Sequence, residues 1–154
     1  SYAERKPSYF GTPAVNLVHA LEKSLDLILK EGMENRFNRH HKIASAFRLA
    51  IKSLGMNMIA KNDTISANTL SAPYYPEGLN GSEFLSGVTN SGVIIAGGLL
   101  GDIKSKYFRV GHMGSVNQGD ILTTIGALES ALMAADYQFE IGTGIKTALA
   151  YLNS

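Results

Sequence analysis

The spacing of the hydrophobic residues changes from helical to strand-like near residue 55, and this change constrains the fold more than any other feature. Before it, apolar residues recur at steps of three and four in two runs. The first run begins at Thr12-Pro13, a favourable N-cap and first helical position, ends near Gly32 and contains Leu17, Val18, Leu21, Leu25 and Ile28. The second run ends at Gly55 and contains Phe37, Ala44, Phe47, Ile51 and Leu54. We predict two long helices that extend from the rest of the chain, the first of them as an interface helix.

Beyond Gly55 the sequence predicts short strands that alternate with helices. Strands are expected at 56–60, 68–72, 93–96 (buried) and 106–110. Asn80 with Glu83 resembles a capping box that opens a short helix, and Asn117 with Asp120 caps a longer one. A last helix is expected to contain Ile141, Ile145, Leu149 and Leu152. This order predicts an α+β domain over 12–154, with a small, mostly antiparallel sheet and helices packed on one face, after an arm over 1–11.

Composition and charge exclude several classes of function. The 154 residues carry a net charge of +1 without a basic block, so neither nucleic acid nor an anionic membrane surface is indicated as a partner. No apolar run approaches the roughly 20 residues of a membrane-spanning helix, so we expect a soluble chain. Cysteine is absent, which removes disulfides and zinc–cysteine sites and fits a reducing, cytoplasmic location. The adjacent His40 and His41 point to different sides of a helix, so no metal site is predicted.

The glycine-rich segment Gly97–Ser105 does not match either nucleotide-binding motif. A phosphate-binding P-loop needs lysine directly after its last glycine, where Asp102 stands here. A dinucleotide fingerprint precedes a helix, whereas a strand is expected next. The segment is therefore interpreted as a turn between two strands, in which glycine also permits a close approach of the backbone to a ligand.

Arg109 lies inside an apolar strand pattern and is the strongest candidate for a binding residue. A buried guanidinium is costly unless its charge is paired, and it forms two parallel hydrogen bonds to a carboxylate. Arg109 could therefore bind an anionic ligand, pair with a structural acidic residue, or lie on the solvent face. At the end of the arm, the hydroxyls of Tyr9 and Thr12 could face a phosphate beside a helix start, but the pattern alone clearly favours helix capping by Thr12 and packing by Tyr9.

Three segments in register resemble the class V, fold-type I aminotransferases of the alanine–glyoxylate/serine–pyruvate group. Residues 9–17 (YFGTPAVNL) resemble the family segment Y-F-x-T-P-x-V-N-L. Residues 31–36 (EGMENR) with Arg39-His40 are similar to its E-G-L-E-N…R-H run. Residues 97–99 (GGL) with 108–114 (FRVGHMG) are similar to its G-G-L…R-I/V-G-H-M-G block. The resemblance covers about residues 7–133 and corresponds to the C-terminal portion of such an enzyme.

The resemblance implies a pyridoxal 5′-phosphate cofactor, a homodimer, and roles for individual residues. Arg109 matches the arginine that binds the α-carboxylate of the amino-acid or 2-oxo-acid substrate. Tyr9 and Thr12 match the pair that reaches the cofactor phosphate of the neighbouring subunit. Gly97 and Gly98 match backbone near the mouth of the active site, and no catalytic role carries over to His112. The implied activity is transfer of an amino group between alanine or serine and a 2-oxo acid such as glyoxylate.

The family's Schiff-base lysine lies upstream of the Y-F-x-T-P segment, and none of the nine lysines here has a matching context. Because that lysine bonds to the cofactor and then transfers the proton, we expect no catalytic residue in this chain and no activity of the chain alone. The expectation is a small domain of a larger enzyme whose cofactor domain is absent. The alternative is a non-catalytic module of the same fold that binds a small carboxylate or mediates assembly.

Overall fold

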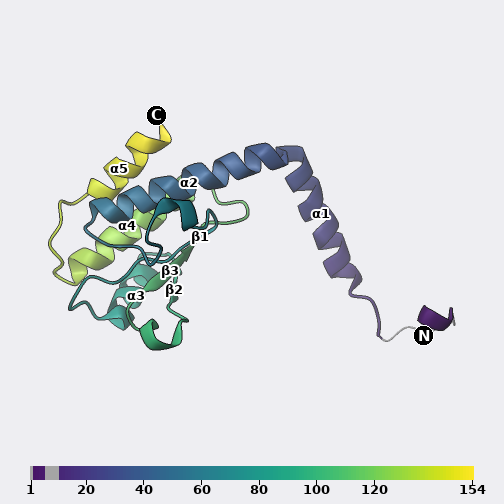
Figure 1. The fold of residues 1–154 in the computed structure, drawn as a ribbon, viewed down its shortest axis with the longest axis horizontal. Coiled ribbons are helices and arrows are strands. Elements are labelled where there is room, and N and C mark those ends of the chain that lie inside the picture. Colours follow the sequence, from purple (N-terminus) through teal and green to yellow (C-terminus); the bar gives the residue numbers. More distant parts are fainter. Residues whose placement is uncertain (1, 6–10) are drawn as a thin grey trace. The chain divides into compact units, whose positions relative to one another are not determined.

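The computed structural model describes residues 2–5 and 11–154, which divide into two compact units. The first unit is Ser1–Phe37 and the second is Asn38–Ser154. Helices and strands follow one another along the chain as drawn in Figure 1. Each unit is described by itself below.

The first unit contains a short 3-10 helix, η1 (Tyr2–Glu4), and the helix α1 (Val15–Glu31). The predicted first helix is confirmed, and it ends at Gly32, whose φ of 84° is a backbone conformation that favours glycine. Its predicted start was wrong by a few residues. The N-cap is Ala14 rather than Thr12, and no side chain caps the helix. The arm beyond η1 falls largely on residues 6–10, which lie outside the described residues.

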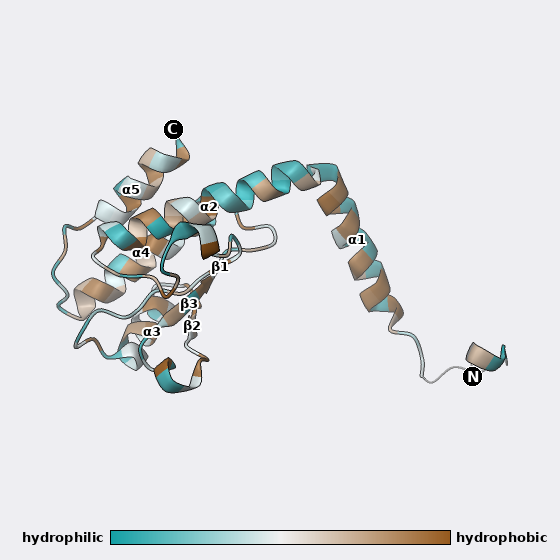
Figure 2. Ribbon diagram, viewed as in Figure 1, coloured by the Kyte–Doolittle hydropathy of each residue, from teal (hydrophilic) through white to brown (hydrophobic). Residues whose placement is uncertain are grey.

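The helix α1 has no buried residue, although its sequence is clearly amphipathic. Its exposed large apolar side chains are Val15, Leu17, Val18, Leu21, Leu25, Leu27 and Leu29. Figure 2 shows these apolar residues as brown segments of α1 between hydrophilic ones. An apolar helix surface of this kind is typical of an interface, so the interface role of α1 stays a prediction.

The second unit contains most of α2 (Met33–Ser53), followed by α3 (Gly81–Asn90), α4 (Gln118–Ala134) and α5 (Thr143–Leu152). The caps predicted for α3 and α4 are confirmed. The Asn80 side chain accepts hydrogen bonds from the amides of Ser82 and Glu83, and Asn117 forms a complete capping box with Asp120. None of the described helices is both long and apolar enough to span a membrane.

Three short strands form an antiparallel sheet in the order β1-β3-β2: β1 (Leu70–Ser71), β2 (Ala96–Gly97) and β3 (Phe108–Gly111). The 3-10 helix η2 (Asp63–Ile65) precedes β1, and a second one, η3 (Gly101–Ile103), lies between β2 and β3. The register places Ala96 opposite Arg109 and Leu70 opposite Gly111. The glycine-rich segment is a turn between β2 and β3, as predicted.

Two of the strand predictions were wrong. Residues 56–60 form no strand, and only Met58 makes an isolated bridge, to Pro73. Residues 93–95 precede β2 and pair with no strand, and the Ile94 side chain is 87% exposed instead of buried. An apolar run identifies a strand only when a partner strand is available, and here β3 has neighbours on both sides for only a few residues.

The core lies on one face of the sheet. Phe108 and Val110 of β3 are buried, and the Phe108 ring lies 5.2 Å from that of Phe84 in α3. Buried residues of α2, α4 and α5, among them Phe47, Leu128 and Ala148, belong to the same cluster. Because side chains alternate between the faces of a strand, Arg109 and Gly111 lie on the opposite face. The predicted α+β architecture is confirmed.

The carboxylate side chain of one glutamate lies almost wholly inside this core. Glu129 of α4 is 4% exposed, and its carboxylate accepts hydrogen bonds from the amides of Gly142 (2.7 Å), Gly144 (2.8 Å) and Ile145 (3.3 Å). It therefore caps the N-terminus of α5 from a different helix. Ile141, which was expected inside the last helix, precedes it and is 68% exposed.

Candidate functional site

Arg109 lies on the face of β3 that the helices do not cover. Its cross-strand neighbour is Ala96, and the next residue of β3 on that face is Gly111. Ala96 and Gly111 are both exposed and have at most a methyl side chain, so they leave room around the guanidinium. The Arg109 side chain is itself half-buried. The sheet thus presents a single cation among small residues.

The backbone of β2 holds the guanidinium of Arg109 in place. Its Nε donates a hydrogen bond to the carbonyl oxygen of Gly97 at 2.8 Å. No carboxylate among the described residues forms an ion pair with Arg109. The two terminal nitrogens therefore keep the forked geometry that binds a carboxylate through two parallel hydrogen bonds. Of the three possibilities for Arg109 considered from the sequence, pairing with a structural acid is not seen in the described part of the chain.

A tyrosine that the sequence analysis did not single out fixes the turn beside Arg109. The hydroxyl oxygen of Tyr107 accepts hydrogen bonds from the amides of Leu99 at 2.8 Å and Leu100 at 3.0 Å. Tyr107 is 3% exposed. A Cβ on Gly98 would lie 2.5 Å from the tyrosine ring and 2.4 Å from the Lys104 carbonyl oxygen, so only glycine fits there. The aromatic residue at the start of an otherwise apolar strand was the only sequence signal for this arrangement.

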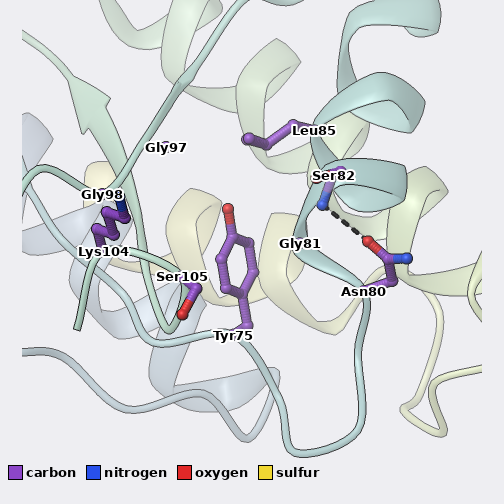
Figure 3. A pocket seen from close by; sticks show the side chains of 9 residues that line it. All are labelled: Tyr75, Asn80, Gly81, Ser82, Leu85, Gly97, Gly98, Lys104 and Ser105. Atoms are coloured by element: carbon purple, nitrogen blue, oxygen red, sulfur yellow. Dashed lines mark hydrogen bonds between the residues drawn. The ribbon is translucent and has the colours of Figure 1, made fainter. Parts of the chain in front are cut away.

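A cavity of about 420 Å³ lies between this turn and the start of α3 (Figure 3). It is lined by Tyr75, Asn80, Gly81, Ser82, Leu85, Gly97, Gly98, Lys104 and Ser105. The helix start and Lys104 resemble an anion site, but Asn80 already occupies the amides of Ser82 and Glu83. The described residues therefore provide an open, mixed polar and apolar hollow rather than a phosphate site.

His112 is buried behind the sheet and takes no part in the face that carries Arg109. Its Nε2 lies 2.9 Å from the Ser71 hydroxyl and its Nδ1 lies 3.2 Å from the Asn68 carbonyl oxygen. Because a carbonyl only accepts, Nδ1 carries the proton and Nε2 accepts from Ser71. Burial lowers the pKa of His112 to about 4, against a smaller opposing effect of the bond to Asn68. The residue is neutral at pH 7, in keeping with a structural role.

This lowered pKa predicts a loss of stability in acid. An exposed histidine takes up a proton near pH 6.5, whereas the folded chain resists protonation of His112 until about pH 4. The contribution of neutral His112 to the stability of the fold is therefore fully present above about pH 6.5, and it is lost as the pH falls from there to about 4. Urea unfolding should show a decrease of about 3 kcal/mol over this range that is missing in His112→Asn. The same pH dependence in both proteins would contradict it.

The other two predicted site residues, Tyr9 and Thr12, belong to the first unit, which is described separately from the unit that contains Arg109. Thr12 belongs to the first unit, is exposed, and hydrogen-bonds with no described residue. Tyr9 lies outside the described residues. His40 is buried and His41 is exposed, and no group of three or more potential metal ligands occurs among residues 2–5 and 11–154.

Comparison with known proteins gives a consistent set of relatives. An uncharacterized aminotransferase of Methanocaldococcus jannaschii is 36% identical over 147 residues, which is 96% of this chain and 37% of the relative. The serine–glyoxylate aminotransferase of Arabidopsis thaliana is 32% identical over 92% of this chain and 35% of its own length. The crystal structure of pyridoxamine–pyruvate aminotransferase from Mesorhizobium loti superposes with a TM-score of 0.88 at 31% identity, covering 97% of this chain and 38% of that one.

These relatives are much longer than the region they share with this chain, which spans about 37% of the first of them. No protein-family model matches the sequence. The shared region includes the sheet, Arg109 and the turn beside it, because each alignment covers more than nine tenths of the chain.

Proposed function

The chain is homologous to class V aminotransferases, and from this premise we propose that it forms the small, substrate-binding domain of such an enzyme. The enzyme would transfer an amino group between alanine or serine and a 2-oxo acid such as glyoxylate. Serine–glyoxylate and pyridoxamine–pyruvate aminotransferases among the relatives support this class of substrate.

The observation that carries the proposal is the guanidinium of Arg109 on the open face of the sheet, which forms no ion pair with any of the described carboxylates. An α-amino acid and a 2-oxo acid share one anionic group, the α-carboxylate, which suits the fork of an arginine. The bond from Nε to the Gly97 carbonyl oxygen leaves both terminal nitrogens for that carboxylate. Arg109 would thereby fix the orientation of the substrate's α-carbon. It would orient the substrate and take no part in breaking bonds.

Pyridoxal phosphate would supply the electron sink that amino transfer requires. The present chain would contribute contacts to the phosphate group of that cofactor in the neighbouring subunit of a homodimer, through Tyr9 and Thr12. The exposed hydroxyl of Thr12 fits this role, because it neither caps α1 nor bonds with any described residue. The lysine that bonds to the cofactor is proposed to lie outside these 154 residues.

Amino transfer by the complete gene product tests the proposed function. With pyridoxal phosphate, glyoxylate and either alanine or serine, we expect glycine to form in proportion to the enzyme added. No glycine from any small amino donor would contradict the proposal and favour a non-catalytic carboxylate-binding module.

The 154-residue chain alone gives a second arm of this test. After incubation with pyridoxal phosphate and reduction with borohydride, we expect no saturable one-to-one adduct in the intact mass. A stoichiometric adduct at one lysine would show that the chain has its own Schiff-base residue, and the proposed division of the enzyme would be wrong.

A further inference from the structure

We propose that Tyr107 is a positioning residue for Arg109, acting through the turn 97–100. The inference rests on the proposed function, because it assigns the turn to the carboxylate-binding site. It is carried by three contacts that connect the tyrosine hydroxyl, the backbone of the turn and the guanidinium.

The first contact fixes the far end of the turn. The Tyr107 hydroxyl accepts hydrogen bonds from two successive amides, those of Leu99 and Leu100. The side chains of these two leucines are 72% and 56% exposed, so burial of apolar surface does not hold this end of the turn. The phenolic oxygen is therefore the main anchor of the two amides within the second unit, and its removal would leave both without this acceptor.

The second contact fixes the middle of the turn. Gly98 passes so close to Tyr107 that an added Cβ would lie 2.5 Å from Cε1 and 2.8 Å from Cδ1 of the ring. The turn is consequently pressed against the ring as well as hydrogen-bonded to its hydroxyl. Residues two apart in a strand share a face, so Tyr107 and Arg109 lie on the same side of the sheet, with the turn beside both.

The third contact makes the position of the Arg109 guanidinium depend on the position of the turn. The carbonyl oxygen of Gly97, one residue before Gly98, accepts the hydrogen bond from Nε of Arg109 at 2.8 Å. A shift of the turn would move this oxygen and rotate the guanidinium with it. A displacement of the order of 1 Å at a substrate-positioning group is enough to cost up to about 100-fold in kcat/KM.

The test is a double-mutant cycle in the complete gene product. Tyr107→Phe keeps the ring that packs on Gly98 and removes only the oxygen. We expect it to raise KM for the amino donor about tenfold while kcat changes less than about threefold. Arg109→Lys keeps a positive charge but lacks the Nε–H that bonds to Gly97, so Tyr107→Phe should change KM less than about twofold in that background.

The matched control is Tyr137→Phe, which removes a hydroxyl that donates to the Leu54 carbonyl oxygen at 3.1 Å, in a different part of the core. We expect it to lower the melting temperature and leave KM unchanged. An equal rise of KM in this control would show a general effect of stability and would overturn the proposal.

The remaining outcomes separate this inference from the proposed function. If Arg109→Lys raises KM and Tyr107→Phe does not, the positioning role of Tyr107 is wrong and the role of Arg109 stands. If Tyr107→Phe raises KM equally with and without Arg109, the tyrosine acts by another route, which also overturns the inference. If Arg109→Lys leaves KM unchanged, the proposed function itself fails, and the inference fails with it.

Discussion

Replacement of Arg109 by alanine is expected to lower kcat/KM of the complete gene product roughly 30- to 5,000-fold, equivalent to about 2–5 kcal/mol of transition-state binding. The variant would lose the group that pairs with the substrate carboxylate, and that carboxylate would remain poorly solvated beside the sheet. Ala96 and Gly111, the small neighbours of Arg109 on this face, offer no replacement donor from their side chains. The loss should appear with the amino donor and with the 2-oxo acid alike, since both have an α-carboxylate.

Lys106→Ala is the matched control for this prediction. Lys106 is an exposed cation in the same segment of the chain, and the variant removes one positive charge without touching the open face of β3. Its kcat/KM is expected to stay within about twofold of the unaltered protein, because exposed charges act weakly at physiological ionic strength. An equal loss in both variants would indicate a general electrostatic effect, and an unchanged kcat/KM in Arg109→Ala would refute the assignment.

Replacement of Glu129 by alanine is expected to destabilise the chain by roughly 4 kcal/mol, the largest effect on stability that we predict. The change removes a buried carboxylate that three backbone amides at the start of α5 use as their acceptor. Gly144 contacts the carboxylate so closely that an added Cβ would lie 2.9 Å from Oε1, so no side chain at that position could take over the role without displacing Glu129. Urea unfolding at pH 7 measures the loss.

Glu140→Ala is the control for the Glu129 variant. Glu140 lies just before α5, is exposed, and its side chain forms no bond with a described residue. Its replacement should change the free energy of unfolding by less than about 0.5 kcal/mol. Similar values for the two variants would show that Glu129 does not act as a remote cap.

The parts of the fold that could be predicted from the sequence are those with local signals. The caps at Asn80 and Asn117 and the stop at Gly32 depend on residues within one or two turns of each other, and all three were placed correctly. The strands were harder, because pairing with a distant segment decides whether an apolar run becomes a strand. For this reason residues 56–60 contribute only a bridge and 93–95 remain outside the sheet.

In the site, as in the fold, features that depend on neighbouring residues could be predicted from the sequence, and contacts between distant residues could not. Arg109 was identified as a candidate from its place in an apolar strand, but its bond to Gly97 depends on the register between β2 and β3. Tyr107 and Glu129 were missed, since their partners lie several residues away across a turn or on another helix. A polar residue on an apolar face signals that a partner exists without identifying it.

The most direct test of the account compares a small amino donor with its amide. Alanine or serine, whichever is the better donor, and the corresponding amino-acid amide differ only in whether the α-carboxylate is present. We expect the unaltered protein to prefer the carboxylate by about 100-fold or more in kcat/KM, and this preference to fall to within about threefold in Arg109→Ala. A preference that persists undiminished in the variant would show that another group recognises the carboxylate and would contradict the central role of Arg109.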